Sequence, residues 1–341
     1  MEATFWKRWR LPLILLAIFP LTIVLPMTGI IDPYVDLVLK YVGINIILTI
    51  SLNLVNGYMG EFSVGHAGFM AIGAYVASIL TVWLFPPGSG AFLFPVALLA
   101  GGIAAGIAGL GLAFPSFRTR GDYLAIVTLA FNMIIKSVLE NVEAIGGPRG
   151  FMGMDKLTSL AWVYVVVIVA VFLARNFVFS NFGRGVLSIR EDEIASGLVS
   201  VRTRQVKVLT FVFSAFLAGV AGGLFAHELQ FINPRSFTIL KSTDMLVMVY
   251  LGGIGSIGGS ILGATVFTVV LEGLRTVLQQ LGISQEWRLV VAPLLLILLM
   301  LYRPRGLFGL REFRFLIPRD EQSEAFDETR RQVASAKEVA P

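Results

Sequence analysis

Three polar side chains interrupt an otherwise apolar, glycine-rich stretch of the chain. Glu61, Ser63 and His66 lie within residues 56–75, which read NGYMGEFSVGHAGFMAIGAY and include five glycines. A glycine inside a helix costs about 1 kcal/mol relative to alanine, and a charged side chain at mid-bilayer costs at least about 2.5–3.5 kcal/mol. This mixture is typical of irregular backbone that is held inside protein at membrane depth, so it predicts part of a translocation path.

Two roles are open for Glu61 and His66. They either line the path or hydrogen-bond the backbone groups that an interrupted helix leaves free. The flanking glycines, Gly60 and Gly65, make regular helical spacing between the two side chains unreliable. We favour the structural role over direct contact with a substrate.

A second run later in the chain resembles the first. Residues 58–65 (YMGEFSVG) are similar to residues 250–258 (YLGGIGSIG) with one residue inserted. The second run adds Gly252, Gly255 and Gly258 to the candidate path or helix break. Corresponding interrupted segments in two halves point to a transporter built from an inverted repeat. Chance similarity between two glycine-rich runs is the alternative.

Catalytic and cofactor chemistry finds no support in the sequence. The glycine-rich residues 251–263 lack the Gly-Lys-Ser/Thr ending that a phosphate-binding loop requires. The chain has no cysteine and two histidines far apart in sequence, which argues against a disulfide, a thiolate metal site or a histidine-rich metal centre. We therefore expect neither an enzyme nor a cofactor, and any ATPase would be a separate chain.

Composition sets the class of protein. The 341 residues are 56% hydrophobic and 14% charged, with a mean hydropathy of +0.80, whereas soluble domains carry about 25% charge. The fold class is therefore an all-α polytopic membrane protein, with a permease domain over residues 1–318 and a polar, disordered tail over 319–341. A span needs about 20 residues. Ten are predicted, at 11–30, 37–55, 66–85, 91–114, 122–142, 160–176, 207–227, 240–254, 259–279 and 288–302.

The distribution of lysine and arginine predicts the orientation. The first apolar run is longer than a usual signal-peptide core and lacks a clear cleavage site, so we expect a retained span. With an inner N-terminus, 19 basic residues fall in the inner segments and 4 in the outer loops. The positive-inside rule then places both termini in the cytoplasm.

The longest predicted inner loop, residues 175–207, is charged and amphipathic. Residues 185–201 are expected to form a short helix that carries the acidic cluster EDE at 191–193. This helix either docks on a soluble partner or lies on the membrane surface through its arginines. Its apolar side consists of Val186, Ile189, Ile194 and Leu198.

Two ion pairs are predicted within the spans. Lys136 and Glu140 lie at i and i+4, and Glu272 and Arg275 lie at i and i+3, so each pair shares one helix face. Local pairing is favoured over contact with a zwitterionic substrate. Asp244 has no role assigned by its position.

Several motifs together resemble one transporter family. In chain order they are SLNLVNGYMGEFSVGHAGFMAIGAY (51–75), RGDYLAIVTLAF (120–131), GGPRG (146–150), SIREDEIA (188–195) and LVMVYLGGIGSIGGSILGA (246–264). They resemble the permease subunits of ABC importers for branched-chain amino acids, over about residues 37–308. The likeness is greater to the longer of the two permeases that pair in such importers.

The resemblance implies partners and a location. They are a second permease in a heterodimer, two cytoplasmic ATPases, a periplasmic or lipid-anchored binding protein and the lipid of a bacterial inner membrane, without nucleic acid. Permeases for urea or short amides look similar and remain an alternative, as does an ion-coupled transporter acting alone. The residues expected to couple to the ATPase are Arg184, Arg190, Glu191, Asp192, Glu193, Ile194 and Ala195.

Overall fold

The computed structural model describes residues 32–86, 90–117 and 123–280 continuously, with scattered residues between 19 and 28 and between 282 and 316. Within these residues, seven helices are long and apolar enough to cross a membrane. The predicted spans 11–30 and 288–302 lie largely outside the described residues, and the predicted tail 319–341 lies wholly outside them. The all-α polytopic class is confirmed.

The helices follow most of the predicted spans. The long ones are α2 (Pro33–Asn53), α3 (His66–Ile79), α4 (Gly90–Ser116), α5 (Tyr123–Asn141), α6 (Leu160–Val178), α9 (Thr203–Leu229) and α11 (Ile257–Gln280). Wider π-helical turns at Leu54–Tyr58 and Leu80–Leu84 extend α2 and α3. The predicted span 240–254 is instead α10 (Ile239–Gly252), whose 14 residues are about 21 Å long. That is too short to cross a 30 Å hydrocarbon layer alone.

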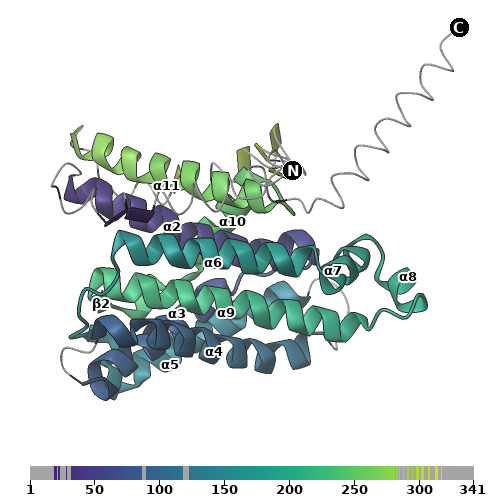
Figure 1. Cartoon of the computed structure of the whole chain (residues 1–341), viewed down its shortest axis with the longest axis horizontal. Coiled ribbons are helices and arrows are strands. Elements are labelled where there is room, and N and C mark those ends of the chain that lie inside the picture. The colour runs from purple at the N-terminus through teal and green to yellow at the C-terminus, as the bar shows by residue number, and fades with distance from the viewer. Residues whose placement is uncertain are drawn as a thin grey trace, which may run out of the picture.

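The bundle has two distinct ends (Figure 1). At one end, α7 (Asn181–Glu191) and α8 (Glu193–Leu198) project beyond the long helices, and we call this the loop end. At the other, the strand end, β1 (Phe151–Met152) pairs antiparallel with β2 (Phe231–Ile232). Three single 3-10 turns lie near these strands, at Glu143–Ile145, Gly147–Arg149 and Pro234–Ser236.

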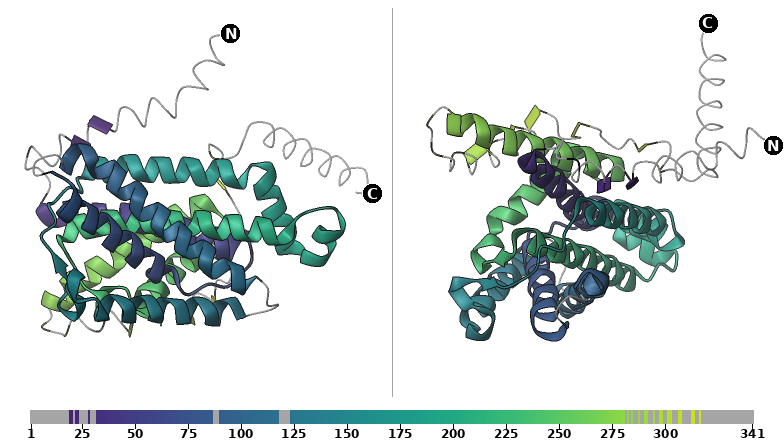
Figure 2. Two further views of the ribbon diagram at one scale, coloured as in Figure 1. Left: turned by 90° about the horizontal axis from the view of Figure 1, so that it is seen from below. Right: turned by 60° about the vertical axis from the view of Figure 1, so that its left-hand side comes forward.

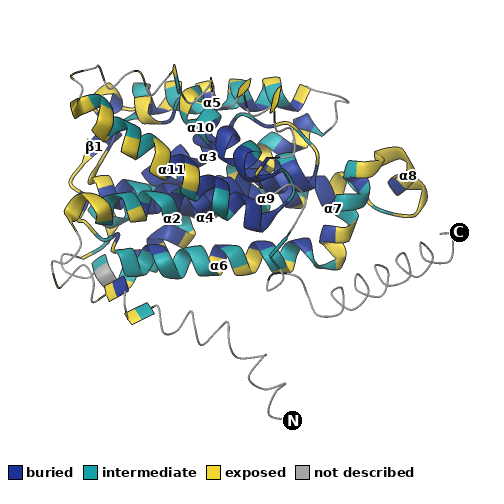
Figure 3. Ribbon diagram, turned by 90° about the horizontal axis from the view of Figure 1, so that it is seen from above, coloured by how far each residue is buried: buried dark blue, intermediate teal, exposed yellow. Residues whose placement is uncertain are grey.

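Helix α9 is the centre of the packing. It lies against α2, α3 and α4, while α2 also packs on α6, α10 and α11. Figure 3 shows the buried residues concentrated along α9 and α3, and Figure 2 shows α11 at the edge of the bundle. The outer faces of α4 and α5 are apolar and exposed, which suits contact with lipid.

Several helices begin at side-chain caps that the sequence supplies locally. Asp32 accepts a hydrogen bond from the Tyr34 amide at 2.7 Å at the start of α2, where Pro33 already has a helical φ. Ser159 and Ser180 cap α6 and α7 in the same way.

Close helix contacts occur where glycines face one another. A Cβ on Gly73 of α3 would overlap the carbonyl oxygen of Gly219 in α9, and a Cβ on Gly101 of α4 would lie 2.7 Å from the Gly73 carbonyl oxygen. Small residues allow backbones to approach in this way. The crossing of α3, α4 and α9 therefore depends on the missing side chains.

Gly73→Ala is expected to lower the free energy of unfolding by about 3 kcal/mol, because the obstructing atoms belong to backbone and cannot rotate away. Gly111→Ala in α4 is the matched control, since a Cβ there meets nothing within 4 Å. Thermal unfolding of both purified variants measures the difference. Equal stability of the two would contradict this account of the helix crossing.

The helix pairs α2–α3 and α10–α11, which contain the two predicted interruptions, run in the same direction. Along α2, Asn45 contacts Lys241 of α10 and Thr49 contacts Met248 of α10. Since both contacts advance toward the loop end, α2 and α10 are parallel, and α3 and α11 both return from that end. An inverted-topology repeat would give these two segments opposite directions, so they do not form the predicted inverted pair.

Candidate functional site

The first break, residues 59–65 between α2 and α3, is irregular backbone whose polar groups are satisfied by distant side chains. The Val64 amide donates to Oγ1 of Thr128 in α5, and the Ala67 amide donates to Oγ of Ser242 in α10, both at 3.1 Å. These bonds replace the intrahelical bonds that a break removes. They also fix the first turn of α3 between α5 and α10.

Ser63 and His66 are buried at this break. The Ser63 amide donates to Oδ1 of Asn56, and the His66 ring nitrogen Nε2 lies 2.8 Å from Oγ of Ser214 in α9. Ser214 in turn donates to the carbonyl oxygen of Ser51. These contacts tie α3 to α2 and α9, which supports the structural role that we favoured for His66.

Glu61 points to a different partner. Its carboxylate accepts a hydrogen bond from Nζ of Lys207 at 2.6 Å, and the same ammonium donates to Glu193 of α8 at 2.8 Å. Only 8% of the Lys207 side chain is exposed, against 52% for Glu193. Lys207 therefore joins the first break to the projecting loop by two charge-assisted bonds in a largely water-excluded position.

Arg190 makes a second connection from the loop. Its Nη1 donates to the carbonyl oxygen of Gly57 at 3.2 Å, while its other nitrogens hold the exposed Glu191. Gly60 and Gly255 have φ of +77° and +76°, and a side chain on either would also meet Arg190. Both positions need glycine, because the left-handed conformation strains other residues.

The second break, residues 253–256 between α10 and α11, meets the first through Asn53. The side-chain nitrogen Nδ2 of Asn53 donates to the Ser256 carbonyl oxygen at 2.9 Å and to Ser260 Oγ at 2.7 Å. Its Oδ1 accepts from the Gly255 amide at 2.9 Å. The end of α2 is thus bonded directly to the turn that begins α11.

A carboxylate from much later in the chain caps α11. Glu312 accepts from the Ile257 amide at 2.8 Å and from the Gly258 amide at 2.7 Å. A negative charge is favourable at the positive N-terminal end of a helix. Glu312 also lies 3.4 Å from the Tyr58 hydroxyl, which places it beside both breaks.

The remaining glycines of the predicted site are contact points. Gly252 faces the backbone of Gly259, and Gly65 faces the backbone of Thr128, so closely that a Cβ on either would overlap it. The backbone is therefore tightly packed at the end of the first break and at the start of the second.

The predicted single helix over residues 185–201 is two helices. Helix α7 ends at Glu191, and Asp192 is extended and caps α8 by accepting from the Ile194 and Ala195 amides. An aspartate at this position favours a new N-terminus over helix continuation. The predicted apolar side is divided accordingly.

The two halves of the predicted apolar side have different surroundings. Val186 and Ile189 are buried, whereas Ile194 and Leu198 are 77% and 83% exposed. Arg184 and the motif residues from Glu191 to Ala195 are exposed as well. The loop thus presents a polar and apolar surface at its tip, and contacts the bundle through α7 and through Glu193 of α8.

The residues that connect these parts are not evident from hydropathy and charge alone. By those measures Lys207 is one basic residue of the loop, and Asn53 is part of an apolar span. A polar side chain within a span is the signal that singles out Asn53. Nothing local marks Glu312, since it caps a helix 54 residues earlier.

The predicted ion pairs are present away from these breaks. Lys136 and Glu140 lie 3.7 Å apart on α5, and Glu272 and Arg275 lie 3.6 Å apart on α11.

The arrangement of the two breaks and the loop suits a conformational change more than catalysis of a reaction. The two breaks are joined through Asn53 inside a bundle of membrane-length helices, and a projecting loop is bonded to Gly57 and, through Lys207, to Glu61 of the first break. This is the architecture of a membrane transport permease. A family model described as "branched-chain amino acid transport system / permease component" matches residues 34–300, and the chain belongs to that family.

Individual relatives agree with the family. The chain is 34% identical over 299 residues to the high-affinity branched-chain amino acid transport system permease protein LivM of Escherichia coli, covering 77% of this chain and 67% of that one. It is 24% identical over 284 residues to LivH of E. coli, covering 77% and 90%. It is 24% identical over 319 residues to a probable LivM of Methanocaldococcus jannaschii, covering 80% and 92%. No solved structure matches the chain.

Proposed function

We propose that this chain is one of two different permease subunits of an importer for branched-chain amino acids, powered by ATP hydrolysis on two separate chains. A binding protein on the far side of the membrane would deliver the amino acid. The names of the relatives support the substrate class, and similarity to both LivM and LivH supports a pair of related permeases.

One observation carries the mechanism. The ammonium of Lys207 bonds Glu61 in the first break and Glu193 in the loop, so displacement of α8 pulls on the break. Arg190 transmits the same displacement to Gly57. An ATPase that binds α8 would use these bonds to shift α3 relative to α2 and switch the path between outward-open and inward-open states.

The orientation follows from this role. An ATPase needs the loop end in the cytoplasm, and the charge of the loop agrees with that placement, because cytoplasmic loops are enriched in lysine and arginine. The strand end then faces the binding protein. The first and last predicted spans would bring both termini to the cytoplasm of a bacterial inner membrane.

Reconstitution tests this function. The chain is purified with its copurifying subunits, placed in proteoliposomes and supplied with ATP and the binding protein loaded with leucine, isoleucine, valine or urea. We expect ATP-dependent uptake of the three amino acids and none of urea. Uptake driven by an ion gradient without ATP or partner chains would contradict the proposal.

The exposed apolar tip of α8 provides a test of docking. Replacing Ile194 and Leu198 together by serine is expected to weaken association with the ATPase about tenfold or more, because well-packed apolar anchors contribute 1–2 kcal/mol each at interfaces. Copurification yield and ATP hydrolysis per complex measure the loss. Met152→Ser is the matched control, since Met152 is 64% exposed at the strand end. Equal association of the double variant and the control would exclude α8 as the docking element.

A further inference from the structure

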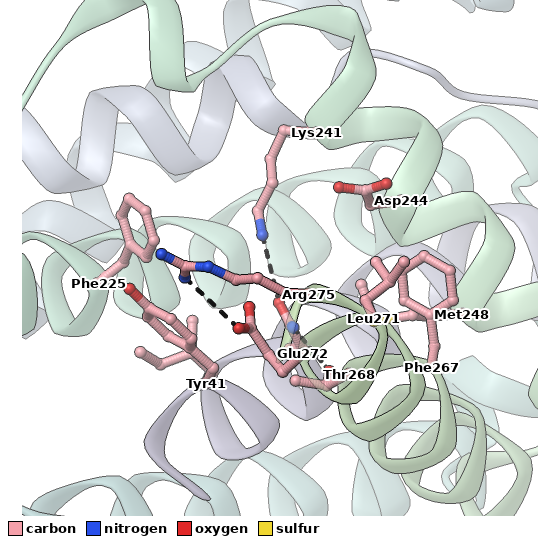
Figure 4. Close-up of a pocket in the computed structure, with 12 residues that line it drawn as sticks. Tyr41, Phe225, Lys241, Asp244, Met248, Phe267, Thr268, Leu271, Glu272 and Arg275 are labelled. Atoms are coloured by element: carbon pink, nitrogen blue, oxygen red, sulfur yellow. Dashed lines mark hydrogen bonds and ion pairs between the residues drawn. The ribbon is translucent and has the colours of Figure 1, made fainter. Parts of the chain in front are cut away.

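A cavity of about 300 Å³ lies between α2, α10 and α11, away from the two breaks. It is in the half of the bundle toward the strand end, because Lys241 is only two residues into α10 and Tyr41 is eight residues into α2. Its volume is at the lower end of the range for small-molecule sites. Figure 4 shows side chains from the surrounding helices converging on it.

Charges of both signs line this cavity. Lys241 and Asp244 come from α10, and Glu272 and Arg275 come from α11. Ionisable side chains inside membrane helices are costly and commonly mark a functional site. Two cations and two anions give the lining no net charge, which favours a ligand that is itself neutral overall but carries both charges.

The charged side chains of the two helices have different neighbours. On α11, Glu272 pairs with Arg275 at 3.6 Å and accepts from the Tyr34 hydroxyl at 3.3 Å. On α10, the Lys241 ammonium lies 3.5 Å from Oδ1 of Asn45 and 5.8 Å from the centre of the Phe225 ring. Lys241 and Asp244 are three residues apart, and therefore share one face of α10.

Apolar side chains form the remaining wall. Ile44, Met248, Phe267 and Leu271 line the cavity, and the first three are almost fully buried. An apolar wall beside a few charged groups is the usual composition of a site that binds a small amphiphile.

We propose that this cavity binds a zwitterionic amphiphile, with its acid group at Lys241, its ammonium at Asp244 and its apolar chain against Met248, Phe267 and Leu271. Two molecules have this chemistry: a free aliphatic amino acid and the headgroup region of an ethanolamine phospholipid. The proposal that an amino acid binds here rests on the proposed function, whereas the proposal that a lipid binds here does not.

The test uses the complete complex in nanodiscs, without binding protein or ATP. One set of discs contains phosphatidylglycerol alone and is titrated with radiolabelled leucine. A second set also contains phosphatidylethanolamine, and native mass spectrometry counts the lipid retained by the complex. Asp244→Asn and Lys241→Met are each expected to weaken retention of the bound ligand about tenfold or more, because each removes a bond to a charged group.

Controls keep the outcomes separate. Glu140→Gln changes a carboxylate of α5 that does not line the cavity, and it should bind as the wild type does. Retention of leucine identifies the amino acid, and retention of phosphatidylethanolamine identifies the lipid. If neither ligand is retained, or if well-folded Asp244→Asn and Lys241→Met complexes retain it unchanged, the cavity proposal fails. ATP-driven leucine uptake is measured separately, and it tests the proposed function independently of ligand binding in the cavity.

Discussion

Lys207→Met is expected to reduce ATP-driven uptake at least about tenfold, with ATP hydrolysis reduced less than uptake. Methionine leaves the carboxylates of Glu61 and Glu193 without their shared cation. Breaking a buried ion pair by removing one partner costs about 3–5 kcal/mol, and the exposure of Glu193 lowers this to about 2–4 kcal/mol. The physical link between the loop and the first break is lost at the same time.

A triple variant separates stability from coupling. Neutralising the carboxylates as well, in Lys207→Met/Glu61→Gln/Glu193→Gln, should recover thermal stability but not uptake. Lys136→Met removes a more exposed cation from its pair on α5, and is expected to change neither property appreciably. Full recovery of uptake in the triple variant would show that Lys207 only stabilises the fold.

Asn53→Leu is expected to lower the free energy of unfolding by about 3 kcal/mol. The side chain makes two hydrogen bonds to the second break and one to Ser260 of α11, and without it the Gly255 amide loses its partner. A buried unsatisfied donor costs about 1–3 kcal/mol, and the lost bonds add to this. Thermal unfolding in detergent measures the effect.

Asn141→Leu is the control for this substitution. Asn141 is exposed at the end of α5, and its side chain donates to the Ser137 carbonyl oxygen one turn earlier. Loss of this exposed, local bond should change the free energy of unfolding by less than about 0.5 kcal/mol. Similar unfolding temperatures for the two variants would contradict a central role for the contact between the breaks.

The sequence predicted the spans well because their signal is local. A run of about 20 apolar residues marks a helix wherever it packs, and α2, α4, α5, α6, α9 and α11 all coincide with such runs. The segment 240–254 coincides with α10, but its 14 residues are too few for the span that hydropathy predicts, because the backbone turns at Gly253, whose φ is +131°. The division of the loop helix at Asp192 follows from capping, which hydropathy also ignores.

The site was predictable only in part. Its glycines and polar residues stood out, since they are unfavourable in a plain membrane helix. The partners of these residues are not apparent from the sequence, because they lie far along the chain: Glu61 and Lys207 are 146 residues apart, and Asn53 and Ser260 are 207 apart. A single sequence shows that the helix is interrupted, but it does not show which distant side chains bond to the interrupted backbone.

The long separation of the capping residues has a consequence for synthesis in the cell. The Ala67 amide at the start of α3 bonds to a residue made 175 positions later, and the Gly258 amide bonds to one made 54 positions later. A chain emerging from the ribosome inserts α2 and α3 well before Ser242 exists. The segment from α2 to α3 must therefore wait in the membrane with its turn incomplete, and nascent chains arrested before α10 lack the group that closes it.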